Sequence, residues 1–137
     1  MRVLIDTNII LDVLLRRSEF RESSSAVLER LCERQDHGFV AATTLTNIYF
    51  IVRRSTGKTD EAMKAVDKTL QWCGIAPVNR KVLNVARFSG MVDFEDAVQA
   101  AAAQDCEIDI VITRDKTGFH DSGLNVYSPE EFLETLK

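Results

Sequence analysis

The expected fold rests on one stretch of the chain, Ile108-Asp109-Ile110-Val111-Ile112-Thr113-Arg114-Asp115. Its first five residues are almost all apolar, which is typical of a short strand buried in a sheet. The polar residues that follow mark the end of that strand. Ligand-binding and catalytic groups in open parallel sheets collect just beyond the carboxyl ends of the strands. Asp115 is therefore expected at such a position.

The rest of the chain alternates between strand and helix patterns. Short apolar runs predict further strands at residues 3–5, 38–41, 74–78 and 125–127. The run at 74–78 contains a proline and is expected to be an edge strand or an irregular one. Apolar residues at helical spacing predict helices at residues 9–15, 23–34, 45–52, 59–72, 82–86, 97–103 and from 129 onward. We therefore expect an α/β fold, a single domain over residues 1–137 with a parallel central sheet flanked by helices.

Composition narrows the class of protein. The chain is 45% hydrophobic and 28% charged, as in globular domains, and its net charge of −4 argues against non-specific adhesion to nucleic acid. Three scattered cysteines without a Cys-x-x-Cys pair predict buried thiols in a reducing cytoplasm. We expect no membrane span, and the acid at position 6 argues against a signal peptide.

Four aspartates stand near predicted strand ends. Asp6 directly follows the first strand and Asp115 the strongest one, while Asp93 and Asp96 begin the Ala-rich helix that precedes it. Hard cations such as Mg²⁺ take oxygen ligands from a few carboxylates. Acids from separate elements at one sheet edge therefore predict a divalent-metal site.

Some of these acids also have structural interpretations. Asp93 is suited to cap its helix, and Asp96 would then favour the positive end of the helix dipole. Three further acids are expected to be solvated or on helix faces, and no site role is given to them: Asp12, Asp105 and Asp109.

Three segments together resemble the signature of the PIN domain family, and most closely its single-domain bacterial members of the VapC-like toxin type. The segments are Val3-Leu4-Ile5-Asp6-Thr7-Asn8, Asp93-Phe94-Glu95-Asp96-Ala97 and Val111-Ile112-Thr113-Arg114-Asp115. The resemblance covers essentially the whole chain. It implies a Rossmann-like parallel sheet and an acidic pocket that binds Mg²⁺ or Mn²⁺ and cleaves RNA.

The resemblance also implies partners and residue roles. Members that belong to toxin–antitoxin pairs are usually homodimers inhibited by a small antitoxin. Matching positions make Asp6, Asp96 and Asp115 the catalytic, metal-binding acids, with Asp93 as an auxiliary ligand. Asn8 and Thr113 match polar residues that line the pocket.

One position departs from the family pattern. Where the family usually places a glutamate after the second strand, this chain has Asn47. An amide lines the pocket without bringing negative charge, and it cannot act as a base near neutral pH. Lower metal affinity is expected, unless Asp93 or Glu95 compensates.

Basic side chains near the predicted acidic site could contact RNA phosphates. Arg114 and Lys116 flank Asp115, and Arg53 and Arg54 form a second basic group; all four are candidate phosphate contacts. Among the aromatic residues, Tyr49 and Phe50 are expected in the core, and Phe119 is expected in a loop. His120, after Asp115, is expected to be a solvated loop histidine.

Two other functions remain open at this level. A PIN fold with weakened catalysis would serve as an RNA- or protein-binding module, and Asn47 favours that alternative. A phosphoacceptor domain also groups aspartates at strand ends, but it needs an acidic pair after the first strand, whereas this chain has Asp6 alone.

Overall fold

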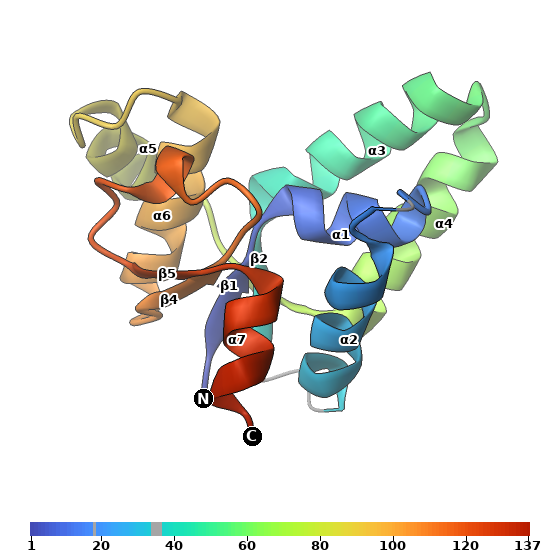
Figure 1. Cartoon of the computed structure of the whole chain (residues 1–137). Helices are drawn as coiled ribbons and strands as arrows, with labels where there is room; N and C mark the ends of the chain where they lie inside the picture. Colours follow the sequence, from blue (N-terminus) through green and yellow to red (C-terminus); the bar gives the residue numbers. More distant parts are fainter. Residues whose placement is uncertain (18, 34–36) are drawn as a thin grey trace.

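The computed structural model describes residues 1–17, 19–33 and 37–137 (Figure 1). Within them, a five-stranded sheet has the order β3-β2-β1-β4-β5, and every neighbouring pair is parallel. The strands are β1 (Val3–Ile5), β2 (Gly38–Ala41), β3 (Gly74–Ala76), β4 (Ile110–Ile112) and β5 (Asn125–Tyr127). The α/β class, the parallel sheet and the edge position of β3 are as predicted.

Helices connect the strands. They are α1 (Thr7–Leu14), α2 (Arg21–Cys32), α3 (Ala42–Thr56), α4 (Thr59–Trp72), α5 (Arg80–Arg87), α6 (Phe94–Asp105) and α7 (Pro129–Thr135), with a short 3-10 helix η1 (Thr117–Phe119) between β4 and β5. The predicted helix at 23–34 corresponds to α2, and its last predicted residue lies outside the described residues. Across the described part of the chain, no helix combines the length and apolar character that crossing a membrane requires.

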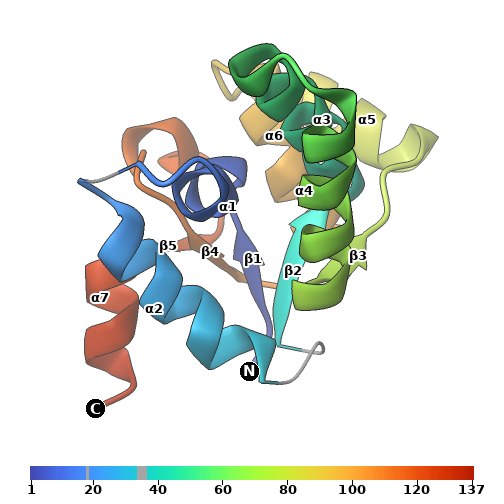
Figure 2. The ribbon, with the colours of Figure 1, turned by 90° about the vertical axis from the view of Figure 1, so that its right-hand side faces the viewer.

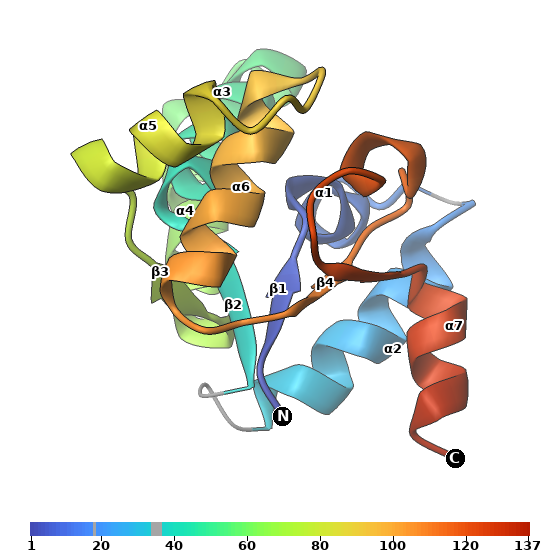
Figure 3. The same cartoon turned by 90° about the vertical axis from the view of Figure 1, so that its left-hand side faces the viewer.

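Side chains alternate between the two faces of the sheet, as strand geometry requires. Val3 and Ile5 pack on the face that is covered by α1, α2, α3, α4 and α7 (Figure 2). Leu4 packs on the other face, which α5, α6 and η1 cover (Figure 3). The buried alanines of α6 have small side chains, so this helix lies close to the sheet.

The strand expected at residues 108–112 is shorter than predicted. Glu107 adopts a left-handed φ of 60°, and the N–H of Ile108 bonds the carbonyl of Ala103 at 2.9 Å, which ties this segment to the end of α6. Sheet pairing therefore begins only at Ile110, although Ile108 is buried.

The shared direction of the strands places all their carboxyl ends at one edge. There β1 leads into α1, β2 leads into α3, and β4 leads into the loop before η1. The two chain termini lie near each other at the opposite end (Figure 1). The extent of the domain, residues 1–137, stays a prediction.

Candidate active site

Asp6 lies at the centre of this edge, directly after β1. Its side chain is only 3% exposed, and both of its carboxylate oxygens accept hydrogen bonds. Gln99 Nε2, from α6, donates to Oδ1 at 3.1 Å, and Thr113 Oγ1, after β4, donates to Oδ2 at 2.7 Å. Two different elements therefore hold the carboxylate from two sides, which fixes its orientation.

The other acids come from the start of α6 and from the loop after β4. Asp93 Oδ1 accepts from the backbone N–H of Asp96 at 2.9 Å, which confirms the predicted helix cap. In the loop, the backbone N–H of Asp115 donates to Thr113 Oγ1 at 2.9 Å. A Cβ added to Gly118 would lie 2.7 Å from an oxygen of Asp96 and 2.7 Å from an oxygen of Asp115. The two carboxylates therefore meet at this glycine.

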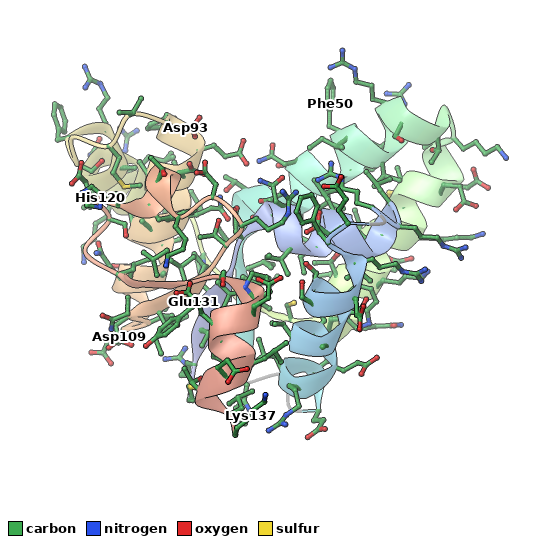
Figure 4. The ribbon with its side chains drawn as sticks, viewed as in Figure 1. Phe50, Asp93, Asp109, His120, Glu131 and Lys137 are labelled. Atoms are coloured by element: carbon green, nitrogen blue, oxygen red, sulfur yellow. The ribbon has the colours of Figure 1, made fainter. Side chains whose placement is uncertain are left out.

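A pocket of about 330 Å³ opens beside these carboxylates. Figure 4 shows Asp93 at the N-terminal end of α6, at the opposite end of the molecule from Lys137. The pocket wall contains four acids, Asp93, Asp96, Asp115 and Asp121, and none of its lining residues is basic. Such a wall suits a cation better than a free anion.

Burial and the charges of neighbouring acids raise the pKa values of two site aspartates, Asp6 and Asp96. Burial raises the pKa of Asp6, although its hydrogen bonds act in the opposite direction. Burial, followed by the charges of neighbouring acids, raises the pKa of Asp96 to about 7; those neighbours are Asp6, Asp93, Asp115 and Glu95. The carboxylates therefore repel one another, and a bound cation would relieve that repulsion.

Replacing Asp96 with asparagine is expected to stabilise the metal-free protein at pH 8. Folding raises the pKa of Asp96 from 3.8 to about 7, so the folded state binds a proton that the unfolded chain releases between these values. The folded state therefore loses stability as pH rises through this window, and the cost is complete above pH 7. Because asparagine cannot ionise, Asp96→Asn should melt higher than the natural protein at pH 8, by on the order of 3 °C.

Thermal melts with a chelator present measure this effect, and the difference should narrow toward pH 5. The exposed acid Asp67 of α4 provides a control, because Asp67→Asn removes a charge far from the site. A lower melting temperature for Asp96→Asn at pH 8 would contradict the electrostatic account of the site.

Replacing Gly118 with alanine is expected to separate the two carboxylates that meet there. The added Cβ would stand 2.7 Å from both Asp96 and Asp115, so at least one short side chain must move. We expect divalent-cation affinity to fall about tenfold, as when the supports of metal ligands are disturbed. His120→Ala is the control, because His120 is exposed and lies just after the same 3-10 helix, pointing outward (Figure 4). Equal affinity in Gly118→Ala and the natural protein would show that no cation binds between these acids.

The donor chemistry of the site fits a hard divalent cation. All the converging side chains offer carboxylate oxygen, the ligand that Mg²⁺ and Mn²⁺ prefer. Among the residues that the structure describes, no three His, Cys, Asp or Glu side chains already surround one point at metal-binding distance. Asp115 is exposed and Asp96 half-buried, so both have room to turn toward a cation while Asp6 stays fixed.

The residues expected to line the pocket differ in their contacts. Thr113 is fully buried and joins Asp6 to Asp115. Asn47, in α3, faces Glu95 of α6: burial raises the pKa of Glu95, while a hydrogen bond from Asn47 lowers it. Asn8 is half-buried in the first turn of α1.

Asp12 was expected to be a solvated or helix-face acid; it stands in α1, but the expectation that it is exposed is wrong. Its side chain is 0% exposed and binds the guanidinium of Arg114 through two hydrogen bonds, at 2.7 and 3.0 Å. Ser24 Oγ adds a third at 3.0 Å. The guanidinium also stacks 3.9 Å above the ring of Phe20. These contacts account for Arg114 without an RNA ligand, because its positive charge is already paired with Asp12 inside the fold.

The other predicted phosphate contacts differ in their availability. Lys116 Nζ forms an ion pair with Glu131 at 2.8 Å. Arg53 and Arg54 are exposed in the last turn of α3, where they also favour the negative end of the helix dipole. Their contact with RNA stays a prediction.

Two expectations about aromatic residues were reversed. Phe50 is 64% exposed, because α3 buries Ile48 and Val52 on its inner side (Figure 4). Phe119 is fully buried and packs with Leu4, among others, on the α6 side of the sheet. The turn of η1 places it there.

Gln99 is the site residue that the sequence interpretation missed. It is 1% exposed within the alanine-rich helix α6. A single long amide among small apolar residues was the available signal, because a buried polar side chain needs a partner. Its partner is Asp6.

A parallel α/β sheet with converging acids at the carboxyl ends of β1 and β4 defines the structural class of this protein. The model of one family, the PIN domain, matches residues 2–117. The chain belongs to the PIN domain family.

Solved structures share this fold. A chain of VapBC2 from Rickettsia felis, crystallised with a promoter DNA fragment, has a TM-score of 0.71 at 15% identity, covering 93% of this chain and 98% of that chain. A chain of a toxin–antitoxin complex from Klebsiella pneumoniae has a TM-score of 0.67 at 20% identity, covering 93% of this chain and 97% of that chain. Mycobacterium tuberculosis VapC20, a sarcin-ricin loop cleaving toxin, has a TM-score of 0.69 at 12% identity, covering 86% of this chain and 93% of that chain. No curated protein matches the chain.

Proposed function

We propose that this protein is a divalent-metal-dependent endoribonuclease and the toxin of a toxin–antitoxin pair. The observation that carries the proposal is the convergence of Asp6, Asp96 and Asp115 at one edge of a PIN-family sheet. Similar folds in a toxin–antitoxin complex and in an RNA-loop-cleaving toxin support it. Mg²⁺ or Mn²⁺ is the cofactor that suits these oxygen ligands.

Each acid has a role in this proposal. Asp6, Asp96 and Asp115 hold the cation, and Asp93 assists from the cap of α6. When bound, a divalent cation supplies positive charge to the scissile phosphodiester and acidifies the attacking water. Thr113 fixes the orientation of the Asp6 carboxylate by donating to its Oδ2. The RNA backbone would then reach Arg53 and Arg54, about 9 Å further along α3 than Asn47, by the rise of a helix.

We also propose a protein partner, either a second copy of this chain or a small antitoxin. Val92, which lines the pocket, is 105% exposed, and Phe94, the first residue of α6, is 53% exposed. Phe88, at the end of α5, is 79% exposed. Exposed apolar groups that gather next to a site favour coverage by protein.

We also propose a cytoplasmic location. It is consistent with the free cysteines, because the cytoplasm keeps thiols reduced. Burial raises the pKa of the Cys73 thiol to about 12, which keeps that thiol protonated.

The test is cleavage of single-stranded and structured RNA by the purified protein. We expect cleavage with Mn²⁺ or Mg²⁺, none after EDTA, and recovery when the metal is restored, because the acids alone cannot stabilise a phosphodiester anion. DNA of the same sequence serves as the control substrate. RNA cleavage that persists in EDTA would contradict the proposal.

The second candidate function is a catalytically weakened PIN module that binds RNA or protein. Asn47 favours it, because an amide stands where the family resemblance implies a glutamate. Under this alternative, RNA binds without being cut, and Asn47→Glu gains cleavage. Efficient cleavage by the natural protein would rule the alternative out.

A further inference from the structure

The first turn of α6 presents acids on two neighbouring faces of the helix. Asp96 faces Gly118 and the loop after β4. Glu95 precedes it by one residue and stands one turn before Gln99, and residues four apart in a helix lie on the same face. Gln99 donates to Asp6 at 3.1 Å. The face of α6 that carries Glu95 is therefore the face turned toward Asp6.

Helix α3 closes the other side of Glu95. It packs against α6, and its Asn47 side chain is a hydrogen-bond partner of the Glu95 carboxylate. One turn earlier, Thr44 Oγ1 lies 2.9 Å from Thr7 Oγ1, which fastens the start of α3 beside the end of β1. Glu95 is thus an exposed residue that contacts α3 through Asn47 and stands on the face of α6 turned toward Asp6.

We propose that Glu95, oriented by Asn47, is the fourth carboxylate of the cation site, an inference that rests on the proposed function. Asp93 is a poorer candidate for this role, because its Oδ1 is already bonded to the backbone of α6. Asn47 then acts as a positioning residue: its amide orients the carboxylate of α6 and adds no charge that would repel it. In this proposal, Glu95 of α6 supplies the carboxylate that α3 lacks at Asn47.

The test is Mn²⁺ binding by isothermal titration calorimetry on the full chain, with thermal melts to confirm folding. We expect Glu95→Gln to weaken Mn²⁺ binding by about tenfold. The matched control is Glu130→Gln, because Glu130 is also exposed and also stands two residues after the cap of its helix, α7. Its variant should bind Mn²⁺ like the natural protein.

A second variant moves the acid back to α3. In Glu95→Gln combined with Asn47→Glu, the carboxylate and the amide exchange places across the same gap. We expect this double variant to recover most of the lost affinity. If it folds but binds Mn²⁺ no better than Glu95→Gln, the placement of the two residues around one cation is overturned.

Asp6→Asn separates failure of this inference from failure of the proposed function. Affinity that is unchanged in Glu95→Gln but lost in Asp6→Asn overturns the role of Glu95 and leaves the nuclease site intact. Affinity that survives in Asp6→Asn places the cation elsewhere and overturns both proposals.

Discussion

RNA cleavage is expected to fall by at least roughly 100-fold when Asp6 is replaced by asparagine, since even indirect supports of metal ligands contribute 10–100-fold. Asp6 is the most buried of the proposed ligands and is held by Thr113 and Gln99. Asparagine keeps its size but removes the negative charge. Single-turnover cleavage of an RNA substrate in Mn²⁺ measures the loss.

The same substitution is not expected to unfold the protein. Burial raises the pKa of Asp6, so the charged form is disfavoured in the fold, and a neutral amide relieves that cost. Metal-free Asp6→Asn should therefore stay folded and melt close to the natural protein, because the relieved charge offsets the one hydrogen bond that the amide nitrogen cannot accept. Asp109→Asn removes an exposed charge at the amino end of β4 and should cleave RNA normally (Figure 4). An unchanged cleavage rate in Asp6→Asn would show that catalysis lies elsewhere.

The parts of this site that sequence could predict are those that depend on local pattern. Asp6 and Asp115 follow buried strands, and parallel strands bring their carboxyl ends together. Asp93 caps α6 as its residue type and position indicated. Helix and strand periodicity was enough to predict these three positions, because each depends only on residues nearby in the sequence.

The parts that sequence could not predict depend on contacts between distant residues. Asp12 and Arg114 stand 102 positions apart, and Gln99 and Asp6 stand 93 apart. A polar residue expected in the core must have a hydrogen-bond partner, but the sequence does not show which residue that partner is. Only the packed fold brings the two together. Phe119 shows the same limit, since its burial depends on the turn of η1.

The buried pair of Asp12 and Arg114 is expected to contribute most to stability. Replacing Asp12 with alanine leaves a guanidinium that is only 23% exposed without its carboxylate. Breaking a buried ion pair on one side typically costs about 3–5 kcal/mol. That is a large part of the roughly 5–15 kcal/mol that stabilises an ordinary domain. We therefore expect Asp12→Ala to melt at least roughly 10 °C below the natural protein.

Two comparisons isolate the cause of that loss. Asp12→Ala combined with Arg114→Met removes the nearer of the two cations that pair with Asp12, the other being Arg17 at 3.5 Å. It also keeps an unbranched side chain over Phe20, so it should recover much of the stability. Glu131→Gln breaks the exposed ion pair with Lys116 and should leave the melting temperature nearly unchanged, since water screens such pairs. A double variant no more stable than Asp12→Ala would show that packing, not the charge, is what Asp12 contributes.

The same pair also connects stability to the proposed chemistry. Arg114 stands between Thr113 and Asp115, so its anchor to Asp12 on α1 holds the loop that carries one of the cation ligands. We expect Asp12→Ala, assayed well below its melting temperature, to bind Mn²⁺ more weakly than the natural protein, whereas Glu131→Gln should not. Unchanged Mn²⁺ affinity in folded Asp12→Ala would show that Thr113 alone is sufficient to hold Asp115, and that the buried pair serves the fold without serving the site.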